Sequence, residues 1–270
     1  MHRLLLQTAA VLHHGYEYLA MAFGLGSLVV LCLAGLPIAL VLLCLPQSIR
    51  VPLGRRLISS TLTIYLWLLR VFCYVRIDDA ALDSVYADRP LIVIANHPSL
   101  LDAVILLSRL PHATCVMKAS LRNHVLFGPM ARLSGYISNK DPMLLVRQAC
   151  DELQAGAHVL LFPEGTRTVT PPVNPFSQTC AFISARSEIA IQCLFFEFST
   201  TYLGKSWPIF RKPTLPLRIT LHLGQKFEPA KDRLDLTERL ESYYRELFVH
   251  QIAQLNSQNG KRRSPCCAKL

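Results

Sequence analysis

The stretch LIVIANHPSLLD, residues 91–102, decides the fold of this chain. Residues 91–96 form a short apolar run rich in β-branched side chains, which predicts a strand buried on both faces. From residue 100 to 109 the apolar positions instead follow a helical period. A strand that leads directly into a helix is the repeating unit of α/β sheets, so the stretch predicts an α/β domain.

The same alternation continues toward the C-terminus. Further β-rich runs stand between segments of helical period, and no internal repeat or low-complexity linker interrupts them. This pattern predicts a single mixed or largely parallel sheet flanked by helices, in one domain over residues 57–256. A basic tail at 257–270 is predicted to be disordered. The remaining predicted strands are 114–118, 158–162, 190–198 and 217–223, and the remaining predicted helices are 142–155, 176–187 and 235–255.

Toward the N-terminus, the chain is almost uniformly apolar. Residues 18–49 carry no charged side chain, and 27 of the 28 Lys and Arg residues lie from Arg50 onward. As one helix this segment would run about 48 Å, whereas the hydrocarbon core of a bilayer is about 30 Å thick. Gly35 and Pro37 fall inside the segment and can kink it. Residues 1–56 are therefore predicted to enter the membrane, either as one tilted span or as a re-entrant hairpin.

The residues that follow the apolar segment predict its orientation. Arg50, Arg55 and Arg56 come directly after it, whereas Arg3 alone precedes it. By the positive-inside tendency, the large C-terminal part is expected on the cytoplasmic side of the inner (plasma) membrane. Residues 57–75 are apolar but interrupted by polar side chains, which fits either an interfacial amphipathic helix or a plain core helix.

The net charge of +10 narrows the class of partner. A basic domain beside an apolar segment is typical of proteins that bind nucleic acid or an anionic membrane surface. The sequence has no recognition-helix, zinc-finger or RNP-type pattern. It therefore favours an anionic membrane surface as partner and excludes nucleic acid.

The residues Asn96 to Asp102 carry the first candidate chemistry. Pro98 suits the first position of a helix, which would place His97 at or near the N-cap and Asp102 just past the first turn. The carboxylate can then reach back to one imidazole nitrogen, fix the tautomer and leave the other nitrogen free as a base. The backbone amides after Pro98 are predicted to stabilise an oxyanion. The alternative is an N-capping pair with Asp102 on a solvated face.

The second candidate is FPEGTR at residues 162–167, which follows another buried-looking strand. Pro163 and Gly165 bracket a turn that is predicted to expose a carboxylate, a hydroxyl and a guanidinium together. Glu164 can accept hydrogen bonds from substrate hydroxyls, and Arg167 can hold a phosphate by two parallel hydrogen bonds. The alternative is a tight turn with a surface ion pair.

In combination, NHPSLLD and FPEGTR resemble the first and third motifs of the glycerophospholipid acyltransferase superfamily, and the chain shares features with a bacterial subgroup. The resemblance covers roughly residues 57–230. It implies that His97 is the general base and that Asp102 supports it. It also implies an acceptor site formed by Glu164, Gly165, Thr166 and Arg167. Lys118 resembles a second, headgroup-binding motif, which usually ends in an arginine where this chain has Ser138-Asn139-Lys140-Asp141.

The resemblance implies a membrane-associated O-acyltransferase of phospholipid biosynthesis. Its donor would be acyl-ACP or acyl-CoA, its acceptor the hydroxyl of a lysophospholipid-like lipid, and no metal or other cofactor is expected. Two other functions stay open, a catalytically inactive membrane lipid-binding protein and a lipid hydrolase. A hydrolase would use Ser99 beside His97, but a GxSxG elbow is absent.

Overall fold

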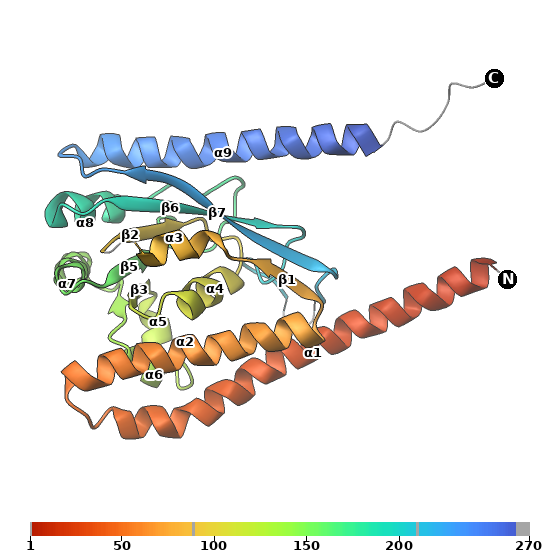
Figure 1. Cartoon of the computed structure of the whole chain (residues 1–270), viewed down its shortest axis with the longest axis horizontal. Helices are drawn as coiled ribbons and strands as arrows, with labels where there is room; N and C mark the ends of the chain where they lie inside the picture. Colours follow the sequence, from red (N-terminus) through yellow and green to blue (C-terminus); the bar gives the residue numbers. More distant parts are fainter. Residues whose placement is uncertain (1, 88–89, 209–210, 263–270) are drawn as a thin grey trace.

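The computed structural model describes residues 2–87, 90–208 and 211–262. Within these ranges the chain forms a mixed sheet of seven strands in the order β1-β7-β6-β2-β5-β3-β4, with helices on both faces (Figure 1). The α/β class predicted from the sequence is confirmed. The strands are β1 (Val75–Asp78), β2 (Ile92–Ala95), β3 (Ala113–Met117), β4 (Ile137–Ser138), β5 (His158–Leu161), β6 (Ile191–Phe198) and β7 (Leu217–Phe227).

The sheet is parallel over most of its width and reverses at one edge. β6, β2, β5, β3 and β4 run in one direction. β7 pairs antiparallel with β6, and β1 pairs parallel with β7. The predicted strands are all present, whereas β1 and β4 were not predicted. Both are too short, at four and two residues, to show a periodicity of their own.

Two cores lie on the two faces of the sheet. Along β2, Val93 and Ala95 belong to one apolar cluster, while Ile92 and Ile94 belong to the other. The first cluster includes side chains of α2 (Gln47–Phe72), α3 (Ala81–Ala87) and α4 (Leu101–Arg109). The second includes side chains of α7 (Pro142–Gln154), α8 (Thr179–Ser187) and α9 (Arg233–Arg262). Two further short helices, α5 (Ala119–Arg122) and α6 (Gly128–Leu133), join β3 to β4.

The apolar N-terminal segment forms a helical hairpin with the segment that follows it. α1 (His2–Leu42) is one long helix that contains Pro37 without ending there, and α2 returns along its side (Figure 1). The helix predicted at residues 57–75 therefore begins earlier, at Gln47, and ends at Phe72. In the described part of the chain, only Val11–Leu42 is long and apolar enough to cross a membrane.

α2 has two apolar faces with different environments. Tyr65, Leu66 and Leu69 are buried in the core. On the other side, Trp67 and Val71 are each more than half exposed. α2 is thus a core helix on one side, as one sequence interpretation had it, and carries an exposed apolar face on the other.

Arg55 differs from the other basic residues near the start of α2. It is buried, its Nη2 lies 2.8 Å from Oε1 of Glu152, and its Nε donates to the carbonyl oxygen of Ser134 at 3.0 Å. Arg55 therefore ties α2 to α7 and to the end of α6. Of the three arginines that follow the apolar segment, Arg56 is exposed and Arg50 is half-buried.

The C-terminal helix is longer than the sequence indicates. α9 continues to Arg262, past the predicted end at residue 255 and into the range predicted as a disordered tail. Residues 263–270 of that tail lie outside the described residues.

Candidate active site

The two sequence motifs meet because their strands are neighbours in the sheet. β2 leads into His97, β5 leads into the turn at residues 162–167, and the two strands pair in parallel. β3, which ends just before Lys118, pairs with β5 on its other side. Parallel neighbours end at the same edge of a sheet, and this edge is where α/β folds bind ligands. The structure thus brings the predicted site residues to one edge.

His97 and Asp102 form the hydrogen-bonded pair that their spacing predicts. Nδ1 of His97 lies 3.1 Å from Oδ2 of Asp102, whose side chain is fully buried. The same oxygen accepts a hydrogen bond from the Ser99 N–H at 3.1 Å. Burial raises the pKa of the Asp102 carboxyl, and the hydrogen bond to His97 acts in the opposite direction. An acceptor at Nδ1 favours the tautomer with its proton there, which leaves Nε2 as the basic nitrogen.

The helix after this pair starts later than predicted. α4 begins at Leu101 with Leu100 as its N-cap, so Pro98 is not the first helical residue and His97 is not the N-cap. The reason is a local turn in which the Ser99 hydroxyl accepts from the Leu101 N–H at 3.2 Å. His97 therefore stands in an extended connection between strand and helix, not on the helix itself.

The same turn removes the oxyanion donors that the sequence predicts. The Ser99 N–H donates to Asp102, the Leu100 N–H to the carbonyl of Leu203 at 3.2 Å, and the Leu101 N–H to the Ser99 hydroxyl. Because these three amides already have acceptors inside the protein, they are not available to an oxyanion in this structure.

The imidazole of His97 is fixed by its surroundings. It stacks on Phe162 of the neighbouring motif, with ring centroids 3.9 Å apart and planes 14° from parallel. Its side chain is 14% exposed, and Nε2 has no hydrogen-bonding partner within the described residues. The His97 N–H donates to Oε1 of Glu164 at 3.0 Å, and its carbonyl accepts from the Thr168 N–H at 2.7 Å. Both the ring and the backbone of His97 are therefore held by the second motif.

Glu164 is not the exposed carboxylate that the sequence predicts. It is 8% exposed, and Oε1 accepts from the Thr168 hydroxyl at 2.7 Å as well as from the His97 N–H. Oε2 accepts from the Asn174 N–H at 2.8 Å. Burial raises the pKa of Glu164, and the hydrogen bonds from Asn174, Thr168 and His97 oppose that shift. The exposure predicted for Glu164 is wrong, because three donors of the protein converge on it and draw it inward.

Arg167 is half-buried and partly engaged. Its Nη1 donates to the carbonyls of Leu203 and Gly204, at 2.9 and 2.7 Å, in the connection between β6 and β7. That connection also contacts the turn after His97, because the Leu100 N–H donates to the Leu203 carbonyl. Nε and Nη2 of Arg167 have no partner within the described residues. The guanidinium is thus oriented by the loop while two of its nitrogens stay available.

The tip of the turn is its most accessible part. Gly165 is exposed and has φ +65°, a left-handed backbone that suits glycine. Thr166 is half-buried. The main-chain N–H groups of Thr166 and Arg167 have no acceptor among the described residues, so they are unused donors at the same edge of the sheet as His97.

Lys118 is an exposed cation at the same edge. It follows β3 and precedes α5, and its side chain has no partner within the described residues. Asn139 fixes this region, because its side chain accepts from the Ala119 N–H at 3.0 Å while its own N–H donates to the Met117 carbonyl at 3.0 Å. The structure therefore gives Lys118 a position suited to an anion.

Several residues that shape the site were not predicted from the sequence. Asn174 accepts from the N–H groups of Val169 and Thr170, at 3.0 and 3.2 Å, and donates to the Arg167 carbonyl at 3.2 Å. Thr168 holds both Glu164 and the His97 carbonyl. The sequence signal for Asn174 was only that of an Asn in a Pro-rich loop, which is typical of many turns.

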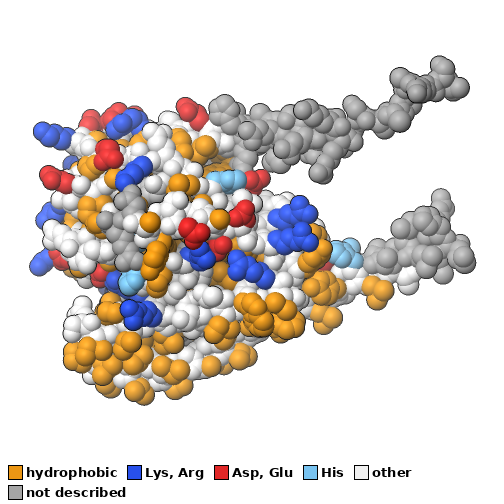
Figure 2. All heavy atoms as spheres, viewed as in Figure 1, with side chains coloured by type: hydrophobic (Ala, Val, Ile, Leu, Met, Phe, Trp, Pro, Cys, Tyr) orange, Lys and Arg blue, Asp and Glu red, His pale blue; other side chains and the backbone are white. Residues whose placement is uncertain are grey.

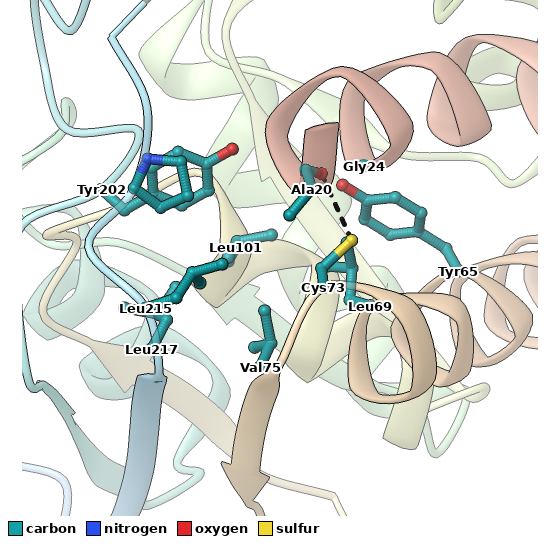
Figure 3. A pocket seen from close by; sticks show the side chains of 11 residues that line it. Ala20, Gly24, Tyr65, Leu69, Cys73, Val75, Leu101, Tyr202, Leu215 and Leu217 are labelled. Carbon is teal, nitrogen blue, oxygen red and sulfur yellow. Dashed lines mark hydrogen bonds between the residues drawn. The ribbon is translucent and has the colours of Figure 1, made fainter. Parts of the chain in front are cut away.

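An apolar pocket lies on the α1–α2 side of the sheet (Figure 3). Ala20 and Gly24 of α1, Leu69 of α2, Leu101 of α4 and Tyr202 of the β6–β7 connection all line it. Leu101 directly precedes Asp102 in the chain, so the pocket adjoins the turn between His97 and α4.

Comparison with known proteins agrees with this geometry. Residues 76–197 match the family described as acyltransferase, and the matched range includes both motifs and Lys118. The resemblance to the glycerophospholipid acyltransferases that the motifs predict is thereby confirmed.

A solved structure shares the fold. The crystal structure of the 1-acyl-sn-glycerophosphate (LPA) acyltransferase PlsC from Thermotoga maritima superposes with a TM-score of 0.62 at 18% sequence identity. The match covers 87% of this chain and 96% of the Thermotoga protein. The shared fold therefore extends well beyond residues 76–197, over most of this chain.

Proposed function

We propose that this acyltransferase moves a fatty acyl group from acyl-ACP or acyl-CoA to the hydroxyl of a lysophospholipid-like acceptor, with His97 as the general base. The observation that carries the proposal is the His97–Asp102 pair, in which Nδ1 is held at 3.1 Å and Nε2 is unpaired at the ligand edge of the sheet. Asp102 keeps the proton on Nδ1, so Nε2 is ready to accept one.

The reaction follows from this arrangement. Nε2 takes the proton of the acceptor hydroxyl as its oxygen attacks the thioester carbonyl. The C–O bond forms, and the carbonyl oxygen of the tetrahedral intermediate becomes negative. The unused N–H groups of Thr166 and Arg167 are the donors we assign to that oxyanion. Collapse of the intermediate breaks the C–S bond, and the imidazolium returns its proton to the departing thiolate.

Two cationic side chains at the same edge of the sheet as His97 indicate the class of acceptor. Arg167 has Nε and Nη2 available on a guanidinium that the β6–β7 connection already orients, and Lys118 is an exposed cation after the adjacent strand. A guanidinium can hold a phosphate by two hydrogen bonds, and an ammonium adds a point charge. We therefore infer a phosphate-bearing acceptor.

The surface of the N-terminal hairpin supports a membrane location. Figure 2 shows hydrophobic side chains gathered over α1 and α2, along the lower edge of the view. Val30, Leu33 and Val41 of α1 and Trp67 and Val71 of α2 are each more than half exposed. Exposed apolar patches of this extent mark sites of protein or membrane contact. We infer that the hairpin, rather than residues 1–56 alone, inserts into an anionic membrane, with the domain on the cytoplasmic side of the inner membrane.

The geometry argues against the two alternatives. Ser99 is 1% exposed, and its hydroxyl accepts a hydrogen bond from the Leu101 N–H, which does not suit a nucleophile that a substrate must reach. A protein that only binds lipid has no need of a stacked, hydrogen-bonded His97 with its second nitrogen unpaired.

The test is a reconstituted assay. The full-length protein in phospholipid nanodiscs receives acyl-ACP or acyl-CoA with lysophosphatidate, and thiol release and diacyl product are measured separately. We expect both in equal amounts. Release of free fatty acid without acylated lipid would identify a hydrolase, and absence of both from wild-type protein would reject acyl transfer between these substrates.

A further inference from the structure

Asn96 occupies the last position before the catalytic histidine and is itself 3% exposed. Its side-chain amide makes a reciprocal pair with the main chain of Phe196 on β6. Oδ1 accepts from the Phe196 N–H at 2.7 Å, and Nδ2 donates to the Phe196 carbonyl at 3.1 Å. A side-chain amide carries the same donor and acceptor as a peptide group, so it can replace one in a ladder.

The replacement occurs where the main chain leaves the sheet. β2 and β6 pair in register as far as Ala95 and Leu194. The main-chain groups of His97 do not continue this pairing with β6. They bond instead to the segment after β5: the His97 N–H donates to Glu164, and the His97 carbonyl accepts from the Thr168 N–H. The Asn96 side chain thus provides hydrogen-bonding partners for the Phe196 main chain on β6, while the backbone of His97 turns toward the segment after β5.

The last part of the regular β2–β6 pairing before Asn96 is also held in place. The hydroxyl of Tyr244, on α9, lies 3.1 Å from the Ile94 carbonyl and 2.8 Å from the Leu194 carbonyl. Tyr244 is completely buried. The end of β2 therefore has little freedom to slide along β6, and the direction in which the chain departs is set at Asn96.

We propose that Asn96 is a positioning residue for the base: its amide substitutes for the next main-chain rung of β6 and lets His97 leave the sheet toward Asp102 and Phe162. The proposal rests on the function proposed above for His97. Without the amide, two buried main-chain groups of Phe196 lose their partners, and the connection that carries His97 is free to shift toward β6 to satisfy them.

Asn96→Ala tests the proposal against a matched control. Gln192 lies on β6, the strand that carries Phe196, and its side-chain amide is also buried. It donates hydrogen bonds to the main-chain carbonyls of Cys193 and Gly224, at 3.0 and 2.8 Å. We expect Asn96→Ala and Gln192→Ala to lower the unfolding temperature of the nanodisc-bound protein by comparable amounts. Only Asn96→Ala should lower kcat, by about tenfold to a hundredfold, because a displacement of about 1 Å at a reacting group has that effect. The KM values for donor and acceptor should stay within about twofold.

A second variant and a second measurement keep the test independent of folding yield and of acyl transfer itself. Asn96→Asp preserves shape but places an oxygen against the Phe196 carbonyl, so it should lose kcat as Asn96→Ala does. In ¹⁵N-histidine spectra, with the His97 signals assigned by comparison with His97→Gln, both Asn96 variants should reduce the population of the Nδ1–H tautomer, and Gln192→Ala should not. Unchanged kcat and tautomer in both Asn96 variants would overturn the proposal. Failure of the proposed function would show instead as wild-type protein without transfer activity.

Discussion

Glu164 offers the sharpest test of how the site is built, because the sequence and the structure assign it different tasks. If Glu164 holds the backbone of His97, Glu164→Ala leaves the main-chain N–H groups of His97 and Asn174 without acceptors. Each such buried group costs about 1–3 kcal/mol, so the free energy of unfolding should fall by roughly 4 kcal/mol. For a chain of this size that corresponds to a decrease of roughly 8–16 °C in unfolding temperature.

Glu164→Gln should be milder, because one amide oxygen can still serve His97 and Thr168 while its NH₂ group opposes the Asn174 N–H. We expect kcat losses of about a hundredfold for alanine and about tenfold for glutamine, with the acceptor KM nearly unchanged. The assay is steady-state transfer with acceptor varied at saturating donor, beside thermal unfolding. Glu152→Ala is the control, since it removes the partner of buried Arg55 away from His97 and should destabilise without lowering kcat. If Glu164→Ala had a normal kcat and unfolding temperature but a raised acceptor KM, this reasoning would be refuted. The sequence-based prediction, in which the Glu164 carboxylate faces the substrate, would then hold.

Further predictions address the base, its partner, the phosphate and the membrane. His97→Ala should reduce transfer by about 10²–10⁴-fold without altering membrane binding, and an activity near wild type would end the proposed mechanism. Asp102→Asn should lose less activity, and its stability relative to wild type should improve as pH rises. Because the folded-state pKa of Asp102 is raised, its contribution to wild-type stability is complete below the usual Asp value of 3.8 and is lost as the pH rises through the folded-state pKa. A flat difference in unfolding free energy between pH 4 and 7, measured in urea, would contradict this. Arg167→Ala should raise the KM of a lysophospholipid about a hundredfold more than that of a matched neutral acceptor, and equal losses would leave Arg167 only its contact with the β6–β7 connection. Trp67→Glu should weaken co-sedimentation with anionic vesicles, whereas Leu234→Glu, equally exposed on α9, should not.

The sequence predicted those parts of the fold and site that depend on short-range pattern. Short apolar runs in the sequence predicted the buried strands, and the spacing of His97 and Asp102 was enough to predict their hydrogen bond. The start of α4 was missed because the Ser99 hydroxyl and the Leu203 carbonyl compete for the first amides, and Leu203 is remote in the chain. The burial of Glu164 was missed for the same reason: its donors come from three separate positions that only the folded chain brings together.

The burial of Glu164 changes the physical interpretation of the FPEGTR motif. A sequence motif reports which side chains are required, but not whether they face the substrate or the protein. In FPEGTR, Phe162 stacks on the imidazole of His97, Glu164 accepts a hydrogen bond from the His97 N–H, and Arg167 holds the connection between β6 and β7 with one nitrogen. The exposed tip at Gly165 and Thr166 and the remaining nitrogens of Arg167 are what the motif leaves for a substrate. The second motif therefore supports His97, and because the protein already engages the carboxylate of Glu164, we propose that the motif contributes to acceptor binding through Arg167 and the main chain.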